Sequence, residues 1–273
     1  MSAQIPVALT IAGSDSSAGA GVQADLKTFS ALGVYGLTAI TCVVAETPGK
    51  VQRIAPVETA MVLAQVELLL EQFPVRAIKT GMLYSAEIVA RVAAVLRQTS
   101  APLVVDPVMV ATSGDLLLQK EAIAIYEREL FPLADVITPN LDEAATLLGE
   151  PIHDLGEMRS AGQRLCERYG VPVLVKGGHL GGTSAIDLLC TRAGVAEFAA
   201  PFTHGVQTHG TGCTYSAGIA AGLAADLPLE AAVQRAKEFV SRAIERHFSW
   251  EKPEHAPLHA LNHSACAPPS LPA

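Results

Sequence analysis

Short apolar runs alternate with amphipathic stretches of helical length along almost the whole of this chain. The apolar runs predict strands at residues 6–12, 37–45, 75–80, 103–106, 136–138, 171–176, 185–190 and 196–202. The stretches between them predict helices at residues 22–32, 57–73, 86–97, 121–130, 140–148, 155–169, 212–225 and 228–247. Strands separated by helices of this length favour parallel β-α-β units. The sequence therefore predicts an α/β fold with a mainly parallel central sheet covered on both faces.

The chain is long enough to form one large domain of this kind. Of its 273 residues 50% are hydrophobic and 17% are charged, so most of the length can be buried around a core. Residues 1–250 contain no internal repeat and no flexible linker, and we expect them to form a single domain. Residues 251–273 are rich in Pro, His and Ala. We expect them to form a C-terminal tail that is disordered beyond residue 263.

Charge and cysteine usage narrow the class of partner. A formal net charge of -8 argues against a nucleic-acid binder, which needs a basic face, but a local site can still bind a phosphorylated small molecule. The five cysteines form no C-x-x-C pair, as is typical of reduced thiols in a cytosolic protein without a zinc site. The sequence shows no leader and no run of membrane-spanning length. We therefore expect a soluble cytoplasmic protein that binds neither nucleic acid nor membrane.

The segment Thr208-His209-Gly210-Thr211-Gly212-Cys213-Thr214 comes directly before a run of small apolar residues at 216–224, which predicts a buried helix. A glycine turn at a helix N-terminus leaves several backbone N–H groups pointing at one spot, and the helix dipole adds positive charge there. This arrangement binds anions. Cys213 lies in the same first turn, so we expect its thiolate to be favoured and able to act as a base or nucleophile. On this segment alone a simpler interpretation stays open, in which the glycines shape a loop and Cys213 is a core residue.

Glycines and polar residues follow the predicted strands, at the edge where ligands bind in parallel sheets. The segments concerned are Gly13-Ser14-Asp15, Glu46, Lys79-Thr80-Gly81-Met82, Asp106-Pro107-Val108-Met109, Thr138-Pro139-Asn140 and Lys176-Gly177-Gly178-His179. We expect them all to face the same side of the sheet as the turn at residues 210–213.

Several of these residues are suited to handling phosphate. Lys176 ends an apolar strand before two glycines, where neutralising a phosphate is its favoured role. Asp106 is either a metal or phosphate-water partner or a solvated strand end. Asn140 and Glu143 have the spacing of a helix cap, which alone explains them, but beside Asp106 they also suit Mg²⁺. Together with the anion turn, these groups predict phosphoryl transfer from a nucleotide to a small alcohol or phosphate.

In these motifs the chain resembles the ribokinase-like superfamily, and within it the hydroxymethylpyrimidine/phosphomethylpyrimidine kinases of thiamine biosynthesis. The matching motifs are Ala12-Gly13-Ser14-Asp15, residues 19–28, Lys79-Thr80-Gly81-Met82-Leu83, Asp106-Pro107-Val108-Met109, residues 138–144, Lys176-Gly177-Gly178-His179 and residues 209–214. The resemblance implies a three-layer α/β/α sandwich, and ATP and Mg²⁺ as cofactors. It also implies a small pyrimidine substrate, phosphorylated first on its hydroxymethyl group and then on the monophosphate, and a homodimer.

The resemblance also implies roles on the nucleotide side. Cys213 stands where sugar kinases of the superfamily carry an aspartate, and it would act as the general base. Gly210, Thr211 and Gly212 would form the anion hole with it. Asp106 and Glu143 would organise Mg²⁺ around the ATP phosphates. The residues predicted to bind the nucleotide are Lys176, Asn140 and Glu143.

On the substrate side, the resemblance implies an aminopyrimidine pocket lined by Gly13, Asp25, Glu46, Met82 and Val108. Asp25 also lies near the start of a predicted helix, where an acid suits the dipole. Position 46 departs from the family, whose members usually have Gln there. Gln both donates and accepts hydrogen bonds, whereas an ionised Glu only accepts. We hypothesise that Glu46 weakens recognition of the unphosphorylated alcohol and leaves the second phosphorylation as the main reaction.

Other functions remain open on the sequence. A pyridoxal or pyridoxine kinase is the nearest, because those relatives share the fold and some have the Gly-Thr-Gly-Cys turn. A thiol enzyme with Cys213 as covalent nucleophile and a catalytically idle ligand sensor are further alternatives. A dinucleotide site at Gly19-Ala20-Gly21-Val22-Gln23-Ala24 is disfavoured, because the tight turn from strand to glycine is missing. Residues 111–115 are our candidate for a cover over the site.

Overall fold

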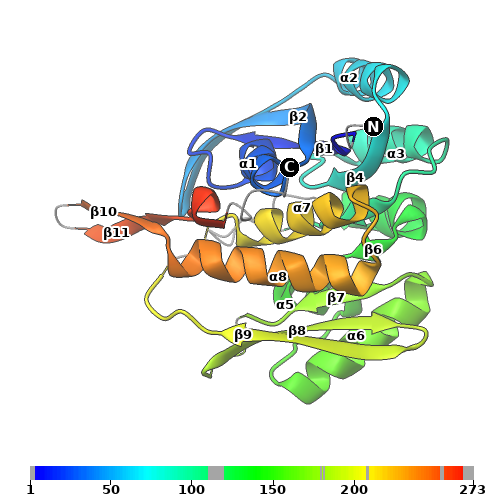
Figure 1. Ribbon diagram of the computed structural model, residues 1–273. Coiled ribbons are helices and arrows are strands. Elements are labelled where there is room, and N and C mark those ends of the chain that lie inside the picture. Colours follow the sequence, from blue (N-terminus) through cyan, green and yellow to red (C-terminus); the bar gives the residue numbers. More distant parts are fainter. Residues whose placement is uncertain are drawn as a thin grey trace.

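The computed structural model describes residues 4–109, 120–178, 180, 182–206, 209–252 and 255–266. Within them, one sheet has the strand order β3-β2-β1-β4-β5-β6-β7-β8-β9 (Figure 1). Its strands are β1 Val7–Asp15, β2 Tyr35–Thr47, β3 Lys50–Pro56, β4 Val75–Thr80, β5 Leu103–Val105, β6 Val136–Ile137, β7 Val173–Lys176, β8 Ser184–Thr191 and β9 Gly194–Pro201. Strands β2, β1, β4, β5, β6 and β7 are parallel. Strands β3, β8 and β9 pair antiparallel at the two edges.

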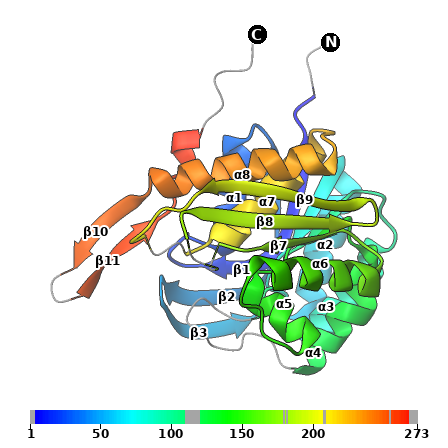
Figure 2. The same cartoon turned by 90° about the horizontal axis from the view of Figure 1, so that it is seen from below.

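Helices cover both faces of this sheet, as Figures 1 and 2 show, so the predicted α/β fold is confirmed. One face carries α1 Gly21–Ala31, α7 Thr211–Ala224 and α8 Leu229–Glu245. The other carries α2 Thr59–Gln72, α3 Ala86–Leu96, α4 Lys120–Ile125, α5 Leu141–Leu148 and α6 Leu155–Tyr169. Among the described residues, no helix combines the length and the apolar character needed to cross a membrane.

The two-residue period of the strands divides the core into two layers. In β1, Leu9 and Ile11 are fully buried in the layer under α2 and α3, whereas Ala8, directly before Leu9, is buried in the layer under α7 and α8. Successive side chains of a strand point to opposite faces, so strands buried on both sides are apolar at almost every position. This explains why the sequence predicts these strands from continuous apolar runs.

Helix α7 is buried along nearly its whole length because small residues let α8 approach it closely. A Cβ on Gly218 would lie 2.9 Å from the Cβ of Ala236, and one on Gly222 would lie 2.7 Å from that of Ala232. Both are closer than real Cβ contacts, so the two helix backbones require glycine at these positions. The predicted buried helix is confirmed, and its tight packing fixes the place of its N-terminal turn.

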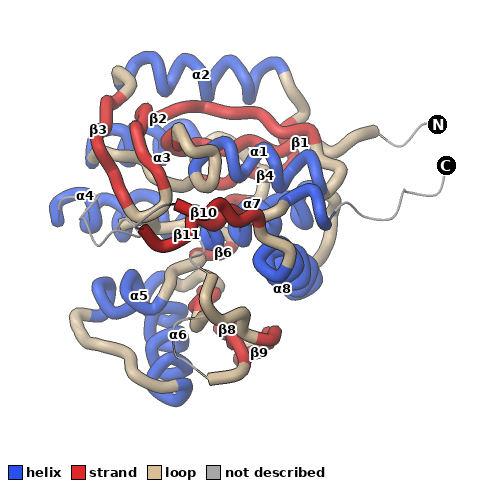
Figure 3. Tube along the Cα trace, turned by 90° about the vertical axis from the view of Figure 1, so that its left-hand side faces the viewer, coloured by secondary structure: helices blue, strands red, loops and turns tan. Residues whose placement is uncertain are grey.

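The predicted helix over residues 121–130 is α4 followed by a π-helical turn, Tyr126–Leu130, and larger differences from the predictions concern strand β3 and the C-terminal segment. Strand β3 is missing from them, because its pattern is mostly polar and its residues are half-buried or exposed at the sheet edge. Residues 255–266, predicted to belong to a C-terminal tail, instead form strand β11 His255–Ala260 and a 3₁₀ helix, His263–Cys266. Strand β11 pairs with β10 Phe248–Lys252 in a hairpin that projects from the molecule (Figures 1 and 2) and is seen end-on in Figure 3. Pairing with β10 and burial of Leu261 hold this segment, and neither is visible in its Pro- and Ala-rich composition.

Candidate active site

The ends of the parallel strands lie side by side, joined by backbone hydrogen bonds that continue beyond the strands. These bonds run from Gly81 N to Ile11 O (3.0 Å), Asp106 N to Thr80 O (2.9 Å), Thr138 N to Val105 O (2.9 Å) and Lys176 N to Pro139 O (2.9 Å). Consecutive segments that follow β4, β5, β6 and β7 are therefore neighbours along one edge of the sheet. The structure brings together the strand-end segments as the sequence predicts.

The turn at residues 210–213 reaches the same edge from α7. Gly210 caps this helix in the left-handed conformation, with φ 82°. A Cβ there would lie 1.8 Å from the carbonyl oxygen of Gly19, so only glycine fits. The backbone N–H of Thr214 donates to the Gly210 carbonyl over 2.9 Å and closes the first helical turn. The N–H groups before Thr214 precede the helical hydrogen-bond ladder, as an anion site requires.

A lysine and an aspartate face this turn. The Lys176 Nζ lies 2.9 Å from Asp106 Oδ1, and the Ser216 hydroxyl of α7 donates to Asp106 Oδ2 over 3.1 Å. A Cβ on Gly212 would be only 3.1 Å from the Lys176 Nζ, which places this amine directly beside the turn. Burial opposes the charge on Asp106, but Lys176 and then Lys79 outweigh it and lower the pKa of this carboxyl. An ion pair thus lies against the N-terminus of α7.

Asn140 and Glu143 form the helix cap that their spacing predicts. The Asn140 side chain accepts from Glu143 N and the Glu143 carboxylate accepts from Asn140 N, both over 2.8 Å. Glu143 is 3% exposed, and burial raises its pKa to about 7; Lys176 opposes the rise, while Asp106 adds to it. Capping therefore accounts for part of what this pair does. It does not explain why a second carboxyl is buried close to Asp106 and Lys176.

The donor set at this edge fits a divalent cation. Asp106 and Glu143 supply carboxylate oxygens, the ligands that Mg²⁺ prefers. The Asp106 carboxylate opposes the ionisation of Glu143, and both carboxyls raise the pKa of Lys176. Two buried acids therefore share one lysine, an excess of negative charge that a cation would relieve.

Cys213 is half-buried and lies among charged groups from three distant parts of the chain. Burial raises the pKa of its thiol to about 11; the Lys79 ammonium opposes the rise, whereas Asp25 and Asp106 add to it. The prediction of a favoured thiolate is wrong for this structure. Burial, with Asp25 and Asp106, outweighs the Lys79 ammonium and a hydrogen bond with the Gly21 backbone, both of which lower this pKa.

Lys79 is a site residue that the sequence places at the ligand edge of the sheet without predicting a role for it. Its amine lies 2.8 Å and 3.0 Å from the two carboxylate oxygens of Asp25, and both side chains are 0% exposed. The Thr10 hydroxyl also donates to Asp25 over 2.6 Å. Burial would lower the pKa of Lys79, but Asp25, Cys213 and Asp106 outweigh it and raise that pKa above its usual range. The signal for this pair in the sequence is a lysine that directly follows the apolar residues Ala77 and Ile78 in strand β4.

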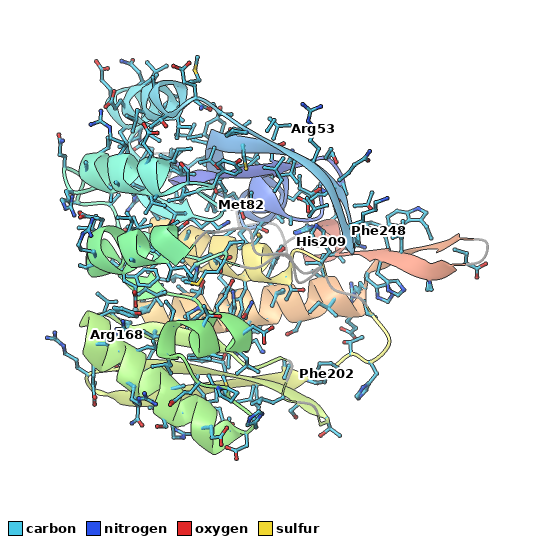
Figure 4. The ribbon with its side chains drawn as sticks, turned by 180° about the vertical axis from the view of Figure 1, so that it is seen from behind. Arg53, Met82, Arg168, Phe202, His209 and Phe248 are labelled. Atoms are coloured by element: carbon cyan, nitrogen blue, oxygen red, sulfur yellow. The ribbon has the colours of Figure 1, made fainter. Side chains whose placement is uncertain are left out.

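Three of the predicted pocket residues, Gly13, Met82 and Val108, belong to the ends of β1, β4 and β5 or to the segments that follow them. Gly13 packs against Cys42, whose Sγ would be 2.8 Å from a Cβ at that position. The carbonyl of Met82 accepts from the Thr41 hydroxyl over 2.6 Å, and Val108 follows β5 with its N–H bonded to Asp106 O over 2.9 Å. Met82 and His209 come from the ends of β4 and α7 and are labelled in Figure 4.

Glu46 belongs to a cluster with Asp15 and His209, whose carboxylates and ring nitrogen lie within 4.8 Å of one another. Asp15 accepts hydrogen bonds from the backbone N–H groups of Gly19 and Ala20 and lies 3.1 Å from His209 Nε2. Burial opposes its charge, but these bonds outweigh it and lower its pKa to about 2. Burial, and then the Asp15 carboxylate, raise the pKa of Glu46 to about 7. Asp15 is therefore ionised at neutral pH, whereas its neighbour Glu46 takes up a proton near neutral pH.

Some predicted features lie outside the described residues. They are Thr208, His179, the candidate cover at residues 111–115 and residues 267–273 of the predicted tail.

The sequence matches the phosphomethylpyrimidine kinase family over residues 15–259. The chain belongs to this family. A hydroxymethylpyrimidine/phosphomethylpyrimidine kinase from Rhizobium meliloti (strain 1021) is 47% identical over 239 residues, which are 87% of this chain and 90% of the relative. The family resemblance read from the motifs is confirmed, and with it the prediction of a phosphotransferase.

Solved structures agree with this fold. A phosphomethylpyrimidine kinase from Clostridium difficile 630 superposes with a TM-score of 0.77 at 39% identity, covering 88% of this chain and all (100%) of its own. An ADP complex of Bacillus subtilis pyridoxal kinase superposes with a TM-score of 0.87 at 36% identity, covering 96% of this chain and 98% of its own. Phosphomethylpyrimidine kinases and pyridoxal kinases therefore share the ribokinase-like architecture found here.

Proposed function

We propose that this protein transfers the γ-phosphoryl group of ATP to 4-amino-5-hydroxymethyl-2-methylpyrimidine, to its monophosphate, or to both, and so forms the diphosphate used in thiamine biosynthesis. The observation that carries the proposal is the meeting of the Lys176–Asp106 ion pair with the glycine turn that contains Cys213. Family membership supports the pyrimidine as the substrate class.

On the nucleotide side, Gly210, Thr211, Gly212 and Cys213 surround the transferring phosphoryl group with backbone N–H groups. Lys176 neutralises phosphate charge, and the helix that Asn140 and Glu143 cap presents its N-terminus to the nucleotide. Asp106 and Glu143 would hold Mg²⁺, which when bound neutralises charge on the phosphates.

For the alcohol substrate, we propose that Cys213 accepts the proton. The hydroxyl oxygen attacks the γ-phosphorus, the bond to the bridging oxygen of ADP breaks, and the hydroxyl proton passes to the Cys213 thiolate. The resulting thiol later returns this proton to water. With the thiol pKa at about 11, the thiolate is a minor form at neutral pH, so the proton acceptor limits this step.

On the substrate side, Gly13, Asp25, Glu46, Met82 and Val108 line the pyrimidine pocket in this proposal. Lys79 and Thr10 cover the Asp25 carboxylate, so Asp25 acts on the pocket through its charge and position rather than through exposed surface. Glu46 is half-buried beside Asp15, and its protonation decides whether it can donate to the pyrimidine. If Glu46 weakens recognition of the alcohol, the catalytic efficiency will be higher with the monophosphate than with the alcohol. Glu46→Gln will then raise the catalytic efficiency with the alcohol. Equal efficiency on both substrates, and no effect of the replacement, would remove the idea.

A screen of ADP release with the hydroxymethylpyrimidine, its monophosphate and pyridoxal tests the function directly. Pyridoxal is the second candidate, because a pyridoxal kinase structure covers 96% of this chain. Pyrimidine-dependent ADP release that matches product one to one supports the proposal. Turnover of pyridoxal alone would replace it, and a covalent adduct at Cys213 would favour a thiol enzyme.

We further propose that the protein works as a cytoplasmic homodimer with one kinase domain in residues 1–250. Sedimentation of the purified protein at two concentrations tests the dimer, and fractionation of cells that express it tests the compartment.

A further inference from the structure

The segment after β11 packs against the helix that carries the anion turn. Leu261 and His263 are 4% and 5% exposed, although the match to the kinase family ends at residue 259. The His263 Nε2 lies 3.0 Å from the Thr214 hydroxyl oxygen, and Thr214 directly follows Cys213. A residue near the C-terminal end thus contacts the first turn of α7.

The direction of this hydrogen bond follows from the other contacts of the ring. Burial, and then the Lys27 charge, lower the pKa of His263 to about 4, so the ring is neutral at neutral pH. It also hydrogen-bonds to the backbone of Leu261, a contact that favours the protonated ring and is therefore made by an N–H group. A neutral imidazole has one N–H, so its other nitrogen, Nε2, accepts the Thr214 hydroxyl.

The partner of the Thr214 hydroxyl differs from that of two other threonines in helices of this protein, Thr28 and Thr146. Thr28 donates to the Ala24 carbonyl over 2.8 Å, and Thr146 donates to the Asp142 carbonyl over 2.7 Å. Each bonds four residues back, as is usual in helices. The Thr214 hydroxyl instead bonds to the His263 ring, and the backbone N–H of Thr214 donates to the Gly210 carbonyl.

The histidine is itself held in place by α8. The backbone N–H of Asn262 donates to the Ala243 carbonyl over 3.1 Å, and the Asn262 side chain accepts from Ala265 N over 3.1 Å. The ring of Phe239 lies 6.3 Å from that of His263. These contacts connect the end of α8, through His263, to the first turn of α7.

We propose that His263 is a positioning residue for phosphoryl transfer: it holds the Thr214 hydroxyl and so keeps the backbone N–H groups and the sulfur of the turn at residues 210–213 in the geometry that the transferring group needs. This inference rests on the proposed function, because it assigns that turn to phosphoryl transfer.

Two pairs of variants test the role. His263→Leu and Thr214→Val each remove one side of the hydrogen bond, while His263→Gln and Thr214→Ser keep an acceptor and a hydroxyl. We expect the first pair to lower kcat about tenfold with KM for ATP changed by less than about threefold, and the second pair to recover most of the rate. The double variant Thr214→Val with His263→Leu should be no slower than either single one, since both break the same bond.

A substrate-free readout separates this inference from the proposed function. Alkylation of Cys213 by iodoacetamide, followed by peptide mapping, should be several-fold faster in His263→Leu and Thr214→Val than in the native protein, and near native in Thr214→Ser. If no substrate releases ADP but this alkylation pattern holds, the kinase proposal fails and the positioning contact stands. Native kcat and native alkylation in both disruptive variants would overturn the inference. So would losses that add up in the double variant, or a lower melting temperature with unchanged kcat.

Discussion

Replacing Cys213 with alanine should separate the two phosphorylations that we propose. The first nucleophile is an alcohol, which must lose its proton. The second is a phosphate oxygen, which is already ionised at neutral pH because the second pKa of a phosphate monoester is about 6. A proton acceptor at position 213 therefore serves the first reaction and is dispensable in the second.

The size of the expected pH dependence follows from the pKa of the Cys213 thiol. With its pKa raised to about 11, the thiolate fraction is about 1 in 10⁴ at pH 7 and about 1 in 10² at pH 9. For the alcohol, kcat should therefore rise about a hundredfold between these pH values if proton transfer to the thiolate limits the rate. Glu46 and Glu143 have pKa values of about 7, so their ionised fractions rise by no more than about twofold between pH 7 and pH 9, far less than the expected hundredfold.

The assay is ADP release at saturating ATP and substrate at pH 7, 8 and 9. Cys213→Ala should lower kcat for the alcohol by about 10²–10⁴-fold and remove its rise with pH, while the rate with the monophosphate falls much less. Cys213→Asp should turn over the alcohol without this rise, because its carboxylate is ionised throughout. A native rate independent of pH, or equal losses on both substrates in Cys213→Ala, would refute the reasoning.

Three further predictions concern single positions. Gly210→Ala should lower the melting temperature and abolish activity, because the new Cβ clashes with the Gly19 carbonyl and the left-handed backbone adds about 1–2 kcal/mol of strain. The matched control is Gly205→Ala, which also has a positive φ but no atom within 4 Å of the added Cβ; equal melting temperatures of the two variants would contradict the clash. Lys79→Met should lower the free energy of unfolding in urea by about 3–5 kcal/mol, because it leaves Asp25 buried without its partner, and adding Asp25→Leu should recover much of this loss. A loss under about 1 kcal/mol in the single variant would argue against a charged pair. Glu46 has a pKa of about 7, so KM for the alcohol should rise from pH 6 to pH 8 as Glu46 loses the proton that it donates, and Glu46→Gln should remove this rise. If KM rises in the same way in Glu46→Gln, another group is responsible for it.

The positions of the strand ends could be predicted because parallel strands with helical crossovers leave little freedom. Apolar runs at 75–80 and 103–106 identify two neighbouring buried strands, and the polar residues after them must then lie at one edge. The cap at Asn140 and Glu143 was equally accessible, because its two hydrogen bonds join residues three apart. The edge strand β3 was not, because a half-exposed polar strand has no apolar pattern.

The sequence by itself determined the layered α/β fold, the buried helix behind the glycine turn and the family to which the chain belongs, since all three depend on periodicity and on motifs of neighbouring residues. Tertiary structure alone decided the charge states and the contacts that tune the site. Lys79 meets Asp25 across 54 positions, and Thr214 meets His263 across 49. The thiol of Cys213 is less acidic than its helix terminus suggests. Desolvation and charge pairing depend on which distant groups share a buried volume, and only the packed chain defines that volume.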